Sequence, residues 1–261
     1  MSPEKTEKTK KIRADELLVL QGKVPSRAAA KALIMAGKVR SGPDSVVAKP
    51  AALLPADAAL SVEQPPRFVG RAGEKLACAL EHFAIGAVGA HALDVGASTG
   101  GFTDCLLQNG AADVVCVDVG RGQLHAKLRD DPRVVNLEKI NARALDTQPL
   151  PRDTFDIVVM DVSFISLTKV LVPVWARVAQ DGWLVALIKP QFEADKAAVD
   201  KGSGVIRDAA IHARVVEGIL DFIGKNLIGA VVSGVVPSPI EGGDGNREFL
   251  VAARKLAGIR D

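Results

Sequence analysis

One stretch constrains the fold more than any other: Ala92 to Asp104 reads Ala-Leu-Asp-Val-Gly-Ala-Ser-Thr-Gly-Gly-Phe-Thr-Asp. It predicts a buried strand, then a turn of small residues, then a helix that opens near Phe102. Glycine allows backbone conformations and close approaches that a side chain would block. The turn therefore suits a ligand that lies against the main chain. The alternative interpretation is an ordinary strand-turn-helix corner that binds nothing.

The spacing of the glycines narrows the choice of ligand class. Gly96, Gly100 and Gly101 give Gly-x-x-x-Gly-Gly, which differs from the Gly-x-Gly-x-x-Gly of dinucleotide-binding proteins, and no Walker lysine follows. This argues against NAD and ATP. A second apolar strand ends at Asp118, about 20 residues beyond the turn, where a doubly wound fold binds the hydroxyls of a ribose. A tight turn and an acidic residue for the ribose hydroxyls, without a phosphate site, best fit S-adenosylmethionine.

Alternation of strands and helices fills the chain after this stretch. It predicts an α/β fold with a seven-stranded, mostly parallel sheet covered on both faces, ending in an antiparallel pair. The expected strands are 91–95, 113–118, 133–137, 155–160, 183–188, 227–235 and 248–253. The expected helices are 73–83, 102–109, 122–129, 166–179 and 208–224.

A smaller domain precedes this one. We expect a charged tail over 1–11, a domain over 12–63 and a stiff, proline-containing linker over 64–70, followed by the large domain over 71–261. The small domain should hold helices at 12–20 and 28–35, the second capped by Ser26, and short strands at 38–40, 46–47 and 60–62. A generic helical cap is the alternative interpretation.

Charge is unevenly divided between the two parts. Residues 1–66 contain 11 Lys and Arg against 7 Asp and Glu, whereas the remainder contains 22 against 24. A basic patch on a small module indicates contact with nucleic acid, although lysine-rich tails are often merely solvated. Tyrosine is absent and aromatic residues make up only 4%, which argues against a base-stacking platform of the RRM kind. The candidate RNA-binding residues are Arg13, Lys23, Arg27, Lys31, Lys38 and Arg71.

Charged residues stand at the ends of three predicted strands. Asp161 and Lys189 each follow an apolar run, and Glu248 opens the last strand. In an open α/β sheet, ligand chemistry collects beyond the carboxyl ends of the strands. Lys189 is bounded by Ile188 and Pro190, so solubility does not explain it. These residues are therefore candidates for a catalytic site.

The motifs together resemble one family. The stretch 94–104, Asp-Val-Ser-Phe-Ile-Ser-Leu at 161–167, Leu-Ile-Lys-Pro-Gln-Phe-Glu-Ala at 187–194 and Gly-Asn-Arg-Glu-Phe-Leu at 245–250 resemble the TlyA family of hemolysin-named ribosomal RNA methyltransferases. The resemblance implies an S-four-like RNA-binding domain ahead of an FtsJ-like domain with the Rossmann-like class I methyltransferase fold. The pattern Ile12-Arg-Ala-Asp, Gly22, Ser26-Arg27, Ile34 and Gly37 resembles the S-four-like domain.

The resemblance also implies an activity: 2′-O-methylation of ribosomal RNA with S-adenosylmethionine. Its Lys-Asp-Lys-Glu tetrad falls on Lys75, Asp161, Lys189 and Glu248 by motif match. A neutral lysine can accept the proton of a ribose hydroxyl, and lysine pKa values fall on desolvation or beside a second cation. Lys75 would supply that cation to Lys189, while the two acids orient the ammonium groups. The candidate cofactor-binding residues are Asp94, Gly96, Ser98, Thr99, Gly100, Asp118, Asn141 and Asp161.

Other classes of function are less consistent with the residues. Neither a secretory signal nor an apolar run of membrane length is present, which argues against a membrane-active hemolysin. Three unpaired cysteines and four scattered histidines predict a reduced, cytoplasmic protein without a metal. A non-catalytic RNA-binding or ribosome-assembly factor remains an alternative. The expected partners are ribosomal RNA or ribosomal subunits.

Overall fold

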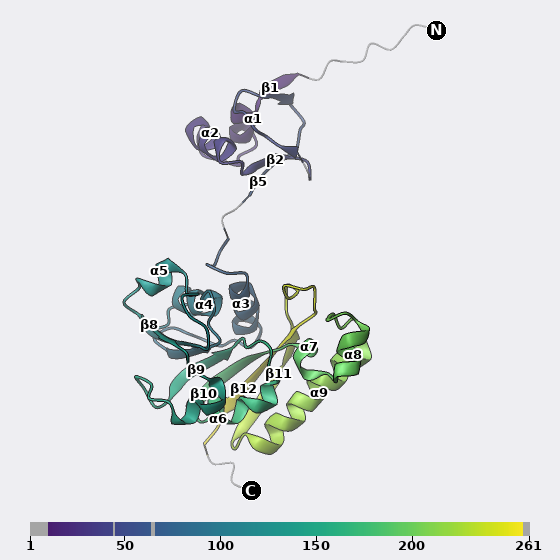
Figure 1. Cartoon of the computed structure of the whole chain (residues 1–261). Coiled ribbons are helices and arrows are strands. Elements are labelled where there is room, and N and C mark those ends of the chain that lie inside the picture. The colour runs from purple at the N-terminus through teal and green to yellow at the C-terminus, as the bar shows by residue number, and fades with distance from the viewer. Residues whose placement is uncertain (1–9, 44, 64–65, 258–261) are drawn as a thin grey trace. The chain divides into compact units, whose positions relative to one another are not determined.

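The computed structural model describes residues 10–43, 45–63 and 66–257 and divides the chain into two compact units between Pro65 and Pro66 (Figure 1). Residues 1–9 of the expected tail and 64–65 of the expected linker lie outside the described residues. The first unit pairs β1 with β4, and β2 with both β3 and β5, all antiparallel. Its elements are β1 (Lys11–Arg13), α1 (Ala14–Leu20), α2 (Arg27–Met35), β2 (Val39–Ser41), β3 (Ser45–Val46), β4 (Leu53–Pro55) and β5 (Leu60–Val62).

The first helix of this unit begins later than predicted. The expected helix over 12–20 starts at Ala14, because the residues before it form β1. Ile12 pairs with Leu54 of β4, a strand that the local pattern does not predict. Local periodicity cannot reveal a partner so distant in sequence. Ser26 does cap α2, since its Oγ accepts the Ala29 N–H at 3.2 Å.

The second unit is an α/β domain, as the alternation predicts. Its seven strands are ordered β11-β12-β10-β9-β6-β7-β8. β12 runs antiparallel to β10 and β11, and the other pairs are parallel. The strands are β6 (His91–Val95), β7 (Asp113–Asp118), β8 (Val134–Glu138), β9 (Phe155–Met160), β10 (Val178–Ile188), β11 (Ala230–Pro237) and β12 (Phe249–Lys255).

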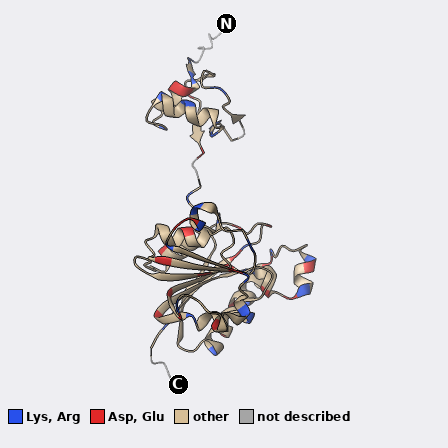
Figure 2. Ribbon diagram, turned by 60° about the vertical axis from the view of Figure 1, so that its left-hand side comes forward, with Lys and Arg blue, Asp and Glu red and all other residues tan. Residues whose placement is uncertain are grey.

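Helices cover both faces of this sheet (Figure 1). Apolar residues of α3 (Ala72–His82) and α4 (Gly101–Gln108) pack with one set of strand side chains. Those of α6 (Leu171–Trp175) and α9 (Ala209–Asn226) pack with the alternate set. Burial on both faces explains why the central strands are almost continuously apolar, and Figure 2 shows the strands largely free of charged residues. The remaining elements are α5 (Ala126–Arg129), η1 (Ala142–Thr147), η2 (Leu167–Lys169), α7 (Pro190–Glu193) and α8 (Lys196–Lys201).

Two predicted helices are shorter than expected. The helix expected over 122–129 is only α5, and that expected over 166–179 splits into η2 and α6. The second stops because Val178 already belongs to β10, where it pairs with Phe155. An apolar run shared by a helix and the next strand does not mark its own boundary. No helix among the described residues is both long and apolar enough to cross a membrane.

Candidate active site

The strand register brings the candidate residues to one edge of the sheet. Val95 and Ala186 both pair with Met160, and Ile188 pairs with Phe249. The residue after each parallel strand therefore lies at the carboxyl edge, and Glu248, one residue before Phe249, lies opposite Lys189. Ligands in doubly wound folds bind at this edge. Asp161, Lys189 and Glu248 stand at this edge, as their positions after or before a strand predicted.

The turn after β6 needs glycine at two positions for different reasons. Gly96 has φ +84°, and a Cβ there would lie 2.6 Å from the Asp161 carbonyl oxygen. Gly100 has φ +91°, and a Cβ there would meet the Leu124 and Leu128 side chains instead. Both conformations strain any residue with a side chain. Gly96 thus permits close contact between the ends of β6 and β9, whereas Gly100 permits the Leu124 and Leu128 side chains to pack against the turn.

A cavity of about 490 Å³ opens beside this turn. Its volume is in the range of small-molecule sites. Of the expected cofactor residues, Gly96, Ser98, Asp118, Asn141 and Asp161 line it.

The Asp118 carboxylate is held at the cavity wall by the main chain. It accepts the Ser98 N–H at 2.8 Å and the Gly120 N–H at 2.7 Å. A carboxylate has about four lone-pair sites, so it can still accept two ribose hydroxyls. Asn141, by contrast, uses its side-chain oxygen to cap η1 through the Arg143 N–H.

A second cavity, of about 170 Å³, adjoins the first. It shares Gly96, Ser98, Asp161 and Ser163 with the larger cavity, and it reaches Lys189. Asp94 and Thr99 line only this smaller space, whereas Gly100 lines neither. The shared walls make the two cavities neighbours, and Lys189 lines the smaller one.

Asp94 is a fully buried acid facing the small cavity. Its Oδ2 accepts the Thr103 hydroxyl at 2.7 Å, and its Oδ1 has no hydrogen-bond partner among the described residues. Burial raises the pKa of Asp94 to about 7; the Thr103 hydrogen bond opposes the rise, and the charge of Asp161 adds to it. An unpartnered acidic oxygen at the cavity fits a cationic ligand such as the sulfonium of S-adenosylmethionine.

Two ion pairs lie at the same edge, one of them buried on both sides and the other half-buried at its acid. Lys75 of α3 places its Nζ 2.5 Å from Glu248 Oε2. Lys189 places its Nζ 2.6 Å from Asp161 Oδ1 and donates to Ser163 Oγ at 2.8 Å. Each lysine is thus paired with a carboxylate, in keeping with the expectation that the two acids orient the ammonium groups. Removing charges from water is costly, so buried ion pairs are poor devices for stability and point to function.

Sequence reasoning missed an aromatic pair beside Lys189. Phe164 is 91% exposed and has φ 62°, which is unusual for a residue with a side chain. Its ring centroid lies 5.2 Å from that of Phe192, and Lys189 Nζ lies 5.9 Å from the Phe192 centroid. The signal was present, because both phenylalanines stand three residues after a candidate catalytic residue. Low overall aromatic content concealed their local concentration.

In the first unit, two of the expected RNA-binding residues gather around one acid. Asp15 is buried, and Arg13 and Arg27 reach its Oδ2 at 2.9 and 3.4 Å. Hydrogen bonds from Arg13 lower the pKa of Asp15 to about 2 although burial opposes the shift. Lys38 pairs with Glu63 at 3.0 Å. Lys23 and Lys31 are exposed, and so is Arg71, which precedes α3 in the second unit.

Comparisons with known proteins agree with this geometry. The model of the FtsJ-like methyltransferase family matches residues 68–255. The 16S/23S rRNA (cytidine-2′-O)-methyltransferase TlyA of Mycobacterium tuberculosis is 43% identical, over 94% of this chain and 90% of its own length. Hemolysin A of Brachyspira hyodysenteriae is 38% identical, over 92% of this chain and 98% of its own.

A solved structure resembles the whole chain as well. A hemolysin-like protein from Streptococcus thermophilus superposes with a TM-score of 0.69 at 38% identity, covering 96% of this chain and 90% of that one. The described residues contain no cluster of three or more His, Cys, Asp or Glu that could hold a metal ion. The family model and the relatives agree on a single assignment. The chain belongs to the FtsJ-like methyltransferase family, and its methyl donor is S-adenosylmethionine.

Proposed function

We propose that this chain methylates ribose 2′-hydroxyls of ribosomal RNA, with Lys75, Asp161, Lys189 and Glu248 as its catalytic residues. The observation that carries the proposal is the presence of two Lys–acid ion pairs at the carboxyl edge of the sheet, one of which, Lys189–Asp161, lines the small cavity. The TlyA relative is named for 2′-O-methylation of rRNA, and it is similar over nearly the whole chain. For a protein that acts on ribosomal RNA, we expect a cytoplasmic location.

The cofactor is held by the main chain and by acids. Gly96 and Ser98 offer backbone contacts to its methionine part, and Asp118 accepts its ribose hydroxyls. Asp94 and Asp161 supply negative charge beside the small cavity, where a sulfonium is favoured. When bound, S-adenosylmethionine supplies an activated methyl group. The residues of the chain must therefore orient the acceptor and remove its proton.

Lys189 is our candidate for the proton acceptor. A ribose hydroxyl loses its proton as its oxygen takes the methyl group, and a neutral Nζ can receive that proton. Asp161 and Ser163 hold the Lys189 Nζ beside the small cavity. Glu248, opposite Lys189 across the register, holds Lys75. The second lysine then supplies positive charge beside the oxygen as that oxygen loses its proton.

Phe164 offers a surface for the acceptor base. Enzymes that act on a base take the target nucleotide out of its stack, and an acceptor nucleotide turned out in the same way would need a surface for its base. Stacking of a base on an aromatic ring contributes about 1–3 kcal/mol and tolerates any base. The exposed Phe164 ring, three residues after Asp161, is positioned for such a contact.

The first unit is our candidate RNA reader. Arg13 and Arg27 share the Asp15 carboxylate, while Lys23 and Lys31 are exposed. Guanidinium groups bind phosphate in a fixed fork geometry, so two of them held by one buried acid are ready for the RNA backbone. We assign the unit an S-four-like role on this basis.

Labelled S-adenosylmethionine and intact ribosomal subunits test the proposal. Mass mapping of the RNA should find one or more 2′-O-methylated nucleotides after incubation with the wild-type protein. Lys189→Ala should bind the cofactor normally and transfer almost no methyl group. Transfer to a base rather than a ribose, or full activity of Lys189→Ala, would contradict the proposed chemistry.

A further inference from the structure

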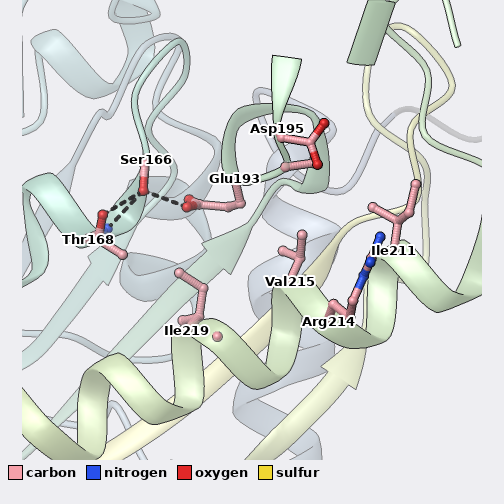
Figure 3. Close-up of a pocket in the computed structure, with 10 residues that line it drawn as sticks. Ser166, Thr168, Glu193, Asp195, Ile211, Arg214, Val215 and Ile219 are labelled. Carbon is pink, nitrogen blue, oxygen red and sulfur yellow. Dashed lines mark hydrogen bonds between the residues drawn. The ribbon is translucent and has the colours of Figure 1, made fainter. Parts of the chain in front are cut away.

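Glu193 joins the two segments that carry Asp161 and Lys189, two of the candidate catalytic residues. It is the last residue of α7, four residues after Lys189. Its Oε2 accepts the Ser166 hydroxyl at 2.6 Å, and its Oε1 accepts the Leu167 N–H at 2.7 Å. Glu193 and Ser166 both line a cleft, and Figure 3 shows the Glu193 carboxylate directed at Ser166. Both oxygens of one side chain are therefore committed to the loop that follows β9.

The hydroxyl groups around this carboxylate can arrange their hydrogen bonds in only one way. Ser166 donates its only hydroxyl proton to Glu193 and accepts the Thr168 N–H at 3.2 Å. Thr168 Oγ1 lies 2.8 Å from Ser166 Oγ, so with the Ser166 proton committed to Glu193, Thr168 must donate there. This set of bonds starts η2 with Ser166 as its cap. The contact thus fixes the end of the loop in one arrangement.

The same two segments also meet at the active site. Lys189 contacts Asp161 and Ser163, and Phe192 contacts Phe164. The loop over 161–166 is consequently attached to the 189–193 segment at both of its ends. Phe164 has a left-handed backbone conformation, which persists in a protein only where the surroundings enforce it. Glu193 provides one such constraint.

We propose that Glu193 is a positioning residue for methyl transfer: by holding Ser166 and Leu167, it sets where the 161–166 loop places Asp161, Ser163 and Phe164 around Lys189. The inference rests on the proposed role of Lys189 and Asp161. Glu193 touches neither cavity beside the glycine turn. It therefore acts on the reaction through the loop and not by contact with the cofactor.

Three variants of the full chain test this role. Glu193→Ala removes both contacts, and we expect kcat to fall roughly 10- to 100-fold, the scale on which a small misplacement of reacting groups slows a reaction. The KM for ribosomal subunits should change by a smaller factor than kcat, because most of the proposed RNA contacts belong to the first unit and only stacking on Phe164 depends on the loop. Glu193→Gln should recover most of kcat, because its amide oxygen can accept the Leu167 N–H and its NH2 can donate to Ser166 Oγ.

Asp195→Asn is the matched control. Asp195 lies in the same cleft (Figure 3) and caps α8 through the Ala198 N–H, a role that asparagine performs equally well. This variant removes one negative charge from the cleft without touching the loop, and it should keep wild-type kcat. Calorimetric titration with S-adenosylmethionine should give one site per chain in every variant, which separates misplacement from partial unfolding.

Different outcomes would overturn different claims. Wild-type kcat in Glu193→Ala, or equal damage in Glu193→Ala and Glu193→Gln, would refute the positioning role while leaving the proposed function intact, provided Lys189→Ala is inactive. Loss of kcat in Asp195→Asn comparable to that in Glu193→Ala would show that charge in the cleft matters and not the contact with the loop. An active Lys189→Ala would instead refute the proposed function itself.

Discussion

The buried acid beside the cofactor cavity should make the second unit less stable as the pH rises. Burial raises the pKa of Asp94 to about 7 in the folded protein, from 3.8 in its absence. Between these two values the folded state binds more protons than the unfolded state, so the free energy of unfolding falls with pH and levels off above pH 7. Each pKa unit corresponds to about 1.4 kcal/mol. The ionisation of Asp94 should therefore lower the free energy of unfolding by roughly 2–3 kcal/mol between pH 5 and pH 8.

Asp94→Asn isolates this contribution. Asparagine cannot ionise, and its side-chain oxygen can still accept the Thr103 hydroxyl. Both tryptophans, Trp175 and Trp183, belong to the second unit, so their fluorescence during urea unfolding follows that unit alone. The wild-type protein should lose roughly 2–3 kcal/mol more stability than the variant between pH 5 and pH 8. Equal losses in the two proteins would refute the assignment of a raised pKa to Asp94.

Two further predictions concern binding. Asp118→Ala should remove most of the rise in melting temperature that S-adenosylmethionine gives the wild-type protein, because a ligand stabilises only the state that binds it; an undiminished rise would remove Asp118 from the ribose site. Asp15→Asn should weaken binding of the full chain to ribosomal RNA several-fold, since Arg13 and Arg27 lose the carboxylate that holds them. Glu16→Gln removes the same charge from an exposed position of α1 and should bind RNA at least as tightly as the wild type in a filter-binding assay. Equal affinities for the two variants would contradict the positioning of the arginines.

The strand pattern predicted the fold because burial on both faces leaves a continuous apolar signature. The same reasoning located Asp161 and Lys189, since each is the first charged residue after such a run. Glu248 was a candidate from its place at the start of the last strand, but its pairing with Lys75 was not, because nothing local reveals that α3 and the start of β12 lie together. Their contact depends on the order of strands in the sheet.

Other features depend on contacts that local patterns do not encode. β1 exists because a distant segment pairs with it. Arg13 and Arg27 were predicted separately as RNA-binding residues, but their common partner Asp15 was not, since a buried acid looks like a surface acid in sequence. Phe164 likewise resembles a core residue by residue type, and its exposure in the structure adds to its position near Asp161 in making it a functional candidate.

Substitution of Lys189 by arginine tests the central claim most directly. Arginine keeps the positive charge and can still pair with Asp161, but it does not lose its proton in a protein. If Lys189 accepts the 2′-hydroxyl proton, single-turnover methylation by Lys189→Arg should be as slow as by Lys189→Ala, roughly 10²- to 10⁴-fold below the wild type. Cofactor affinity should be retained in both variants. Appreciable methylation by Lys189→Arg would contradict the account and transfer the role of base to another residue, with Lys75 the first to be tested.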